Sequence, residues 1–133
     1  MSEENSEKDL FQLGLKIRRE VLGDDYVDAA LAAGADFNGD FQRYITSSAW
    51  GAVWGRDTLS KRDRSLITIC QLAALGHHEE LALHIRAIKN TGLSREDVKE
   101  ALIQVAVYSG VPAANSAYRV ANKVFKEIDD LAQ

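Results

Sequence analysis

The sequence predicts an all-α fold, and three observations carry this prediction. Apolar residues recur at spacings of three and four, which is the period of an amphipathic helix. β-Branched residues are scattered and never alternate with polar residues over the length of a strand. Proline, which breaks helices, occurs only once, at Pro112. We therefore expect a bundle of about six to seven helices.

The N-terminal part should hold three helices. The first covers about residues 6–22 and ends at Gly23, the second covers about 25–34, and Asn38 begins the third. One stripe of the first helix should be buried: Leu10, Leu13, Ile17 and Val21. The buried side of the third should carry Phe41, Ile45 and Trp50. Gly51 and Gly55 bracket an aromatic-rich segment, "AWGAVWGRDT", that we expect to be loosened.

The C-terminal part should hold four more helices. Ser60 opens the fourth, which is apolar almost all round and therefore central, and Gly76 ends it. The fifth runs on to Gly92. Ser94 and Asp97 start the sixth, which "VYSGVP" breaks at Gly110, and residues 113–131 form the last.

Composition and charge restrict the class of protein. The chain has 133 residues, which suits one domain, 1–133, with residues 1–9 flexible. The net charge of −4 argues against a nucleic-acid partner, and no apolar run is long enough to span a membrane. The polar N-terminus does not resemble a signal peptide, and the single cysteine, Cys70, excludes an intrachain disulfide. We expect a cytoplasmic protein.

The fifth helix, "LGHHEELALHIRAIKNTG", carries the candidate chemistry. With His84 at zero and about 100° per residue, Leu81 and Ile88 lie near +60° and +40°, so the apolar face is centred near His84. Glu80 lies at about −40° in the same face. His77 falls at about +20° if the helix reaches it. An acid and a base thus share a face that should be buried.

Three interpretations of this face stay open. Glu80 and His84 could be a satisfied pair in the core or at a subunit interface. They could instead be an acid/base pair in a lined pocket, where desolvation and a neighbouring carboxylate set the proton affinity of the histidine. Finally, His77, Glu80 and His84 could offer three metal ligands, although the HExxH pattern is absent.

Several segments together resemble the carboxymuconolactone decarboxylase family. They are "W…RDTLSKRDRSLITI", "EELALHIRAI" and "YSGVPAAN", and the likeness extends over about residues 10–128. The resemblance implies an alkyl hydroperoxidase D-like helical bundle that assembles into an oligomer, most often a hexamer. Relatives with peroxidase activity carry a CxxC pair at the positions of His77 and Glu80 and a histidine at His84. Because only the histidine is retained, we expect no dithiol cycle, and Cys70 is best interpreted as structural.

The resemblance also implies a reaction, the decarboxylation of 4-carboxymuconolactone to the β-ketoadipate enol-lactone in protocatechuate breakdown. The substrate is a lactone with two carboxylates, and it stores the electrons left by CO₂ itself, so neither a cofactor nor a metal is expected. Within this interpretation His84 donates the proton and Glu80 orients it, or the two roles are reversed. Six further residues are candidates for substrate binding: Arg56, Arg64, Ser65, Trp54, His77 and Asn115.

Arg62 and Arg119 are the substitutes if Arg56 and Arg64 do not bind the substrate carboxylates.

Two other functions remain possible. The chain could run another reaction on the same scaffold, such as a reductase without CxxC or a lactone isomerase, or it could be a non-catalytic helical oligomer.

Overall fold

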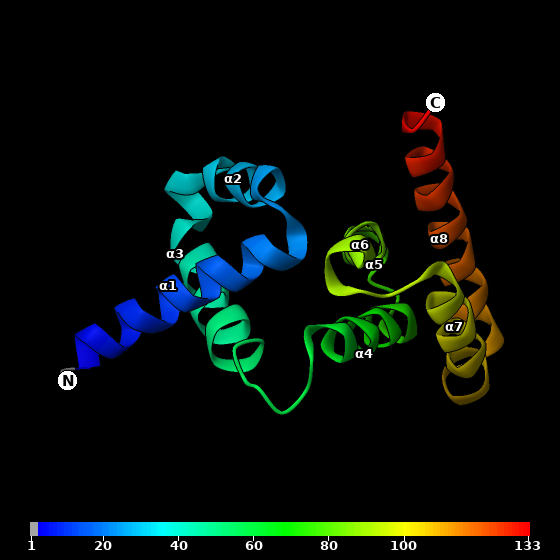
Figure 1. Ribbon diagram of the computed structural model, residues 1–133, viewed down its shortest axis with the longest axis horizontal. Coiled ribbons are helices and arrows are strands. Elements are labelled where there is room, and N and C mark those ends of the chain that lie inside the picture. The colour runs from blue at the N-terminus through cyan, green and yellow to red at the C-terminus, as the bar shows by residue number, and fades with distance from the viewer. Residues whose placement is uncertain (1–2) are drawn as a thin grey trace. The chain divides into compact units, whose positions relative to one another are not determined.

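The computed structural model describes residues 3–133, with side chains described from Ser6 onward, and it confirms the all-α prediction (Figure 1). Eight α-helices and one π-helix, but no strand, occupy this range. The helices are α1 (Glu3–Leu22), α2 (Asp24–Ala32), α3 (Ala35–Ile45), η1 (Thr46–Val53), α4 (Lys61–Leu75), α5 (His78–Arg86), α6 (Ile88–Thr91), α7 (Arg95–Ser109) and α8 (Val111–Leu131). None of the described helices is both long and apolar enough to cross a membrane.

The chain forms two compact units, one up to Ser60 and one from Lys61 to Gln133, which we call unit 1 and unit 2. Whether they act as the single expected domain stays a prediction. Residues 3–9, part of the segment expected to be flexible, belong to α1, and residues 1–2 lie outside the described chain.

Unit 1 is built on the close packing of α1 against η1. The two backbones approach at glycines. A Cβ added to Gly14 would overlap the carbonyl oxygen of Thr46, and one added to Gly51 would overlap that of Leu10. The segment that we expected to be loosened, residues 49–58, is helical up to Val53, with the wider π turn, and continues as turns and bends from Trp54. The π turn places Trp50 against Ile17 and Val21 in a small core.

The buried stripe expected on α1 is only half right. Ile17 and Val21 are buried, whereas Leu10 and Leu13 are 38% and 41% exposed. At this end of α1, Gly51 of η1 approaches the backbone of Leu10, and the Leu13 side chain lies against Gly55.

An arginine that no sequence pattern predicts to be buried lies inside unit 1. Arg18 is 3% exposed, and its Nη1 donates to Gln42 Oε1 at 2.9 Å and to Thr46 Oγ1 at 3.1 Å. Burial lowers the pKa of this guanidinium, and the nearby Tyr26 opposes the shift. These bonds fix which side of α3 faces α1.

The apolar side of α3 is consequently uncovered, and the expectation that Phe41 would be buried is wrong. Phe41 is 57% exposed, and no residue of α3 is buried. Gln42 lies about 100° further round the helix than Phe41. Because the helix is held through Gln42, its aromatic side is turned away from α1.

Unit 2 contains a larger core between α4, α5, α7 and α8. The expected central position of α4 is confirmed, since it packs against the other three helices. Small residues of α8 let the helices approach closely: Ala114, Ala117 and Ala121. The predicted start of α7 is also confirmed, because Ser94 and Asp97 form a reciprocal capping box with bonds of 3.0 and 2.9 Å.

Candidate active site

The helix that carries the candidate residues is shorter than expected. α5 begins at His78 and ends at Arg86, and α6 follows as a single turn up to Thr91. Ala87 lies between them with φ −86° and ψ 0°, which interrupts the regular helix. His77 precedes α5, is exposed, and makes no capping bond with its side chain.

His84 is buried as predicted, with 8% of its surface exposed, but Glu80 is exposed in the chain. The expectation that both would be buried is therefore wrong for Glu80. The fully buried residues of α5 are Leu81 and Ile85, so the core side is centred between them rather than on His84. His84 lies at one edge of that side, and Glu80, about 40° further round, lies beyond it.

The environment of His84 strongly favours its neutral form. Burial lowers the pKa of His84 from 6.5 to about 4, because removing the imidazolium from water is costly. The Glu80 carboxylate is close enough to oppose this shift, but its effect is the smaller one. At neutral pH the chain by itself thus presents an uncharged imidazole beside an exposed carboxylate.

The first turns of α4 supply two buried polar atoms that lack a hydrogen-bond partner among the described residues. Ser65 is 1% exposed, and its buried Oγ has no hydrogen-bond partner among the described side and main chains. Arg64, half-buried, has a buried Nε in the same condition. A buried hydroxyl without a partner costs free energy, which a bound acceptor could recover.

The arginines proposed for carboxylate binding differ in their availability. Arg56, Arg64 and Arg119 form no ion pair within residues 6–133. Arg62 instead lies 3.1 Å from Asp97 and 3.4 Å from Asp63, so its charge is already partnered. Of the two substitutes, Arg119 is therefore better placed to take a new anion than Arg62.

The remaining candidates occupy different parts of the chain. Trp54 is half-buried and stacks on Trp50 with ring centroids 4.9 Å apart, so it has a structural role in unit 1. Asn115 is exposed near the start of α8. Unit 2 brings α5, the helix of His84, against α4 and α8, whereas Trp54 and Arg56 belong to unit 1.

The metal interpretation finds no support in the geometry. Among the side chains that the structure describes, no three histidine, cysteine, aspartate or glutamate residues converge closely enough to hold an ion. His77, Glu80 and His84 are included in that statement.

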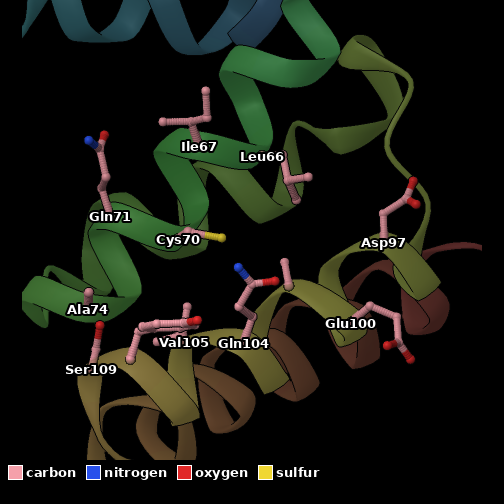
Figure 2. A pocket seen from close by; sticks show the side chains of 12 residues that line it. Leu66, Ile67, Cys70, Gln71, Ala74, Asp97, Glu100, Gln104, Val105 and Ser109 are labelled. Carbon is pink, nitrogen blue, oxygen red and sulfur yellow. The ribbon is translucent and has the colours of Figure 1, made fainter.

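A groove of about 700 Å³ lies between α4 and α7, and sequence reasoning missed it (Figure 2). None of the predicted site residues lines it. Its apolar lining includes Leu66, Ile67, Cys70 and Val105, with Asp97 and Glu100 at one end. One sequence pattern could have predicted this groove. α4 is apolar on nearly every side, so a single core covers only part of its apolar surface. Cys70 is half-buried there, and burial raises the pKa of its thiol.

Comparison of the sequence with known proteins identifies the family of the chain. The model of the carboxymuconolactone decarboxylase family matches residues 39–123, from α3 into α8. The chain belongs to this family.

Two relatives match over most of their length. The 4-carboxymuconolactone decarboxylase of Acinetobacter baylyi is 43% identical over 118 residues, which cover 89% of this chain and 88% of the relative. The nitrosuccinic acid decarboxylase of Metarhizium robertsii is 37% identical over 121 residues, covering 91% and 85%. A 4-carboxymuconolactone decarboxylase sequence from Pseudomonas putida is 49% identical over 45 residues, which are 34% of this chain and 94% of that sequence.

Proposed function

We propose that the chain is a carboxy-lyase that converts 4-carboxymuconolactone into the β-ketoadipate enol-lactone, and that it works in the cytoplasm as a homo-oligomer, with a hexamer as the expected state. The observation that carries this proposal is the 43% identity to the Acinetobacter baylyi decarboxylase over 89% of the chain. The family match over residues 39–123 supports the same class of reaction.

Side chains are sufficient for the proposed decarboxylation, because the substrate itself holds the electron pair that CO₂ leaves behind. When the carbon–carboxylate bond breaks, CO₂ leaves and the bonding electron pair spreads through the unsaturated ring onto the lactone carbonyl oxygen. A proton then adds to the α-carbon and gives the enol-lactone. The protein must bind two carboxylates, stabilise the enolate oxygen and deliver one proton.

His84 is the proposed proton donor, and its neutral resting state sets a condition on that role. A substrate with two carboxylates brings negative charge to the site, and nearby negative charge raises the pKa of an imidazole. Binding would thus draw a proton from solvent onto His84, with Glu80 supporting the charged form. In the reverse assignment Glu80 donates the proton and neutral His84 orients it.

Arg56 and Arg64 are the proposed carboxylate ligands, with Arg119 as the substitute. Arginine offers a fixed pair of donors that matches a carboxylate. The unsatisfied hydroxyl of Ser65 is a candidate donor to the enolate oxygen. Trp54, His77 and Asn115 remain candidates for contacts with the rest of the substrate.

The experiment is turnover of freshly prepared 4-carboxymuconolactone, followed by CO₂ release and by loss of substrate absorbance. We expect His84→Ala to fold, to keep its mass in solution, and to lose roughly a hundredfold or more in kcat, the usual value of a positioned acid or base. His78→Ala is the matched control, because His78 is exposed in the same helix, and it should keep normal turnover. Normal turnover in His84→Ala would remove this histidine from the mechanism.

A second candidate substrate is nitrosuccinic acid, which the 37% identical relative is named for. A nitro group beside the carboxylate can also hold the electron pair that CO₂ leaves behind, so both substrates suit a site without a cofactor. Parallel assays with 4-carboxymuconolactone and nitrosuccinic acid decide between the two substrates, since the better substrate has the higher kcat/KM. A separate assay of peroxide consumption with a dithiol tests the reductase alternative.

A further inference from the structure

The two substrates proposed for this chain share one carbon skeleton, although one is a lactone and the other is a nitro compound. In each of them the carbon that loses CO₂ also carries a CH₂–COO⁻ arm. The departing and the remaining carboxylate are therefore the two ends of a succinate. The same carbon is bonded to a group that accepts the electron pair, either the unsaturated lactone ring or the nitro group. Only this electron-accepting group differs between the two substrates.

The remaining carboxylate needs a cation in the unit that holds His84, and unit 2 offers one that is partly removed from water. Arg64 lies in the first turns of α4, which packs against α5, the helix of His84. It is half-buried, its buried Nε has no hydrogen-bond partner among the described residues, and it forms no ion pair there. Every other lysine and arginine of unit 2 is exposed, and Arg56 belongs to unit 1.

A division of roles between the two carboxylates follows from their chemistry. The departing carboxylate loses its charge as CO₂ forms, so a tight ion pair there would oppose the reaction. The remaining carboxylate keeps its charge, so a cation that binds it holds the reacting end in place without that cost. His84 is uncharged at rest, whereas an arginine stays charged and offers a fixed pair of donors. The guanidinium of Arg64 therefore suits the carboxylate that stays.

We propose that this chain decarboxylates a class of substrates, the succinates that carry an electron-accepting group on the carbon that loses CO₂, and that Arg64 binds the carboxylate that stays. The carbon–carboxylate bond breaks, CO₂ leaves, and the electron pair moves onto an oxygen of the accepting group. One proton then adds to the same carbon, or to the α-carbon of the ring in the unsaturated lactone. This inference rests on the proposed function, because it extends the chemistry of the same site.

The first test compares nitrosuccinic acid with 2-nitropropanoic acid, which has the same nitro group and departing carboxylate but no second carboxylate. CO₂ release is measured for both and corrected for the uncatalysed rate. We expect the kcat/KM of wild type to be at least roughly tenfold higher for nitrosuccinic acid, because a charge-assisted hydrogen-bonded pair contributes at least this factor. Equal values for the two acids would overturn the class.

Arg64→Gln tests the named residue. It should raise KM for nitrosuccinic acid roughly tenfold or more and change kcat less, because a group that is bound equally before and during the reaction contributes to KM. Its kcat/KM for 2-nitropropanoic acid should stay at the wild-type value. Arg86→Gln is the matched control, since it removes an exposed arginine of unit 2 that is already paired with Glu127. Equal losses on both acids in Arg64→Gln would refute the role of Arg64.

Inhibition by succinate needs no variant and therefore keeps the proposal testable if Arg64→Gln fails to fold. Succinate lacks an electron-accepting group, so it should occupy the site without reacting. We expect it to inhibit turnover of 4-carboxymuconolactone competitively, with an inhibition constant at least roughly tenfold lower than that of butanoate, which has one carboxylate. Equal inhibition by the two acids, or inhibition by neither, would contradict the class.

A third electron-accepting group extends the test beyond the two proposed substrates. In 2-acetylsuccinate a ketone can accept the electron pair, so we expect wild type to accelerate its conversion into CO₂ and 4-oxopentanoate above the uncatalysed rate. Failure to do so would contradict the class.

The class and the proposed function fail in different ways. Turnover of 4-carboxymuconolactone without turnover of nitrosuccinic acid or inhibition by succinate overturns the class and leaves the decarboxylase assignment intact. Absence of 4-carboxymuconolactone turnover in wild type overturns the proposed function itself.

Discussion

A buried histidine at the edge of a helix face reacts to acid in two ways, through chemistry and through stability. His84 is nearly fully buried, and its pKa in the folded chain is about 4. In the unfolded chain the same group titrates near 6.5. Between these two values the unfolded chain binds a proton that the folded chain does not, so stability must fall as pH falls through this window.

The linked prediction concerns the free energy of unfolding between pH 7 and pH 4.5. Neutral His84 should make this free energy fall by about 2 kcal/mol more in wild type than in His84→Gln, which cannot titrate. Urea unfolding at several pH values measures the difference. His78→Gln, which removes an exposed histidine of the same helix, should fall as steeply as wild type. Parallel curves for wild type and His84→Gln would mean that His84 is not desolvated.

The sequence predicts such residues only in part. Helix periodicity was sufficient to bury His84, but it placed the centre of the buried face about 80° from the centre that Leu81 and Ile85 define. Because of this difference in angle, Glu80 is exposed instead of buried. A hydrophobic residue indicates that a face is apolar, but the width of the face that neighbours cover depends on tertiary packing. The roles of the binding candidates stay predictions.

At the scale of one element, the π-helix η1 shows what sequence patterns miss. Gly51 lies inside η1, where it allows close packing on the α1 backbone, whereas Gly55 lies in the turn that follows this helix. Helix ends that depend on local signals were predictable: Ser94 begins α7 after a cap, and Gly76 ends α4 with φ 76°. The π turn depends on contact with α1, which no local pattern records.

The packing of α1 on η1 gives a prediction for Gly14. Gly14→Ala should destabilise the chain by about 1–3 kcal/mol, because the added methyl group overlaps the backbone at Thr46 and the helices must separate. Gly39→Ala is the control, since this glycine lies within α3 with open space around it and the change should stabilise by up to about 1 kcal/mol. Urea denaturation measures both. The same change in stability for both variants, or no change for Gly14→Ala, would argue against the close approach of the two backbones.

At the scale of the whole molecule, the two units differ in how much apolar surface they bury. The core of unit 2 contains thirteen buried residues, whereas the cluster in unit 1 contains Ile17, Val21 and Trp50. The family match from residue 39 to 123 includes parts of both units. The overall class of fold was predictable because it depends on helix period alone, but the division into units was not, since it depends on which faces meet.

Unequal cores predict unequal local stability. Amides of α5 and α8 should exchange with solvent roughly a hundredfold more slowly than those of α2 and α3, because regions with few buried contacts open more readily. Native-state hydrogen exchange read by mass spectrometry or NMR measures this directly. Uniform protection along the described helices would show instead that the chain opens as one cooperative body.

The stacked indole pair has a practical consequence for such measurements. The sequence contains two tryptophans, and both lie in or next to η1, within unit 1. Intrinsic fluorescence excited at the indole band therefore reports on the surroundings of two residues of unit 1, whereas far-ultraviolet circular dichroism sums over every helix. A gap between the two thermal curves would identify which half of the chain loses its structure first, without any added label.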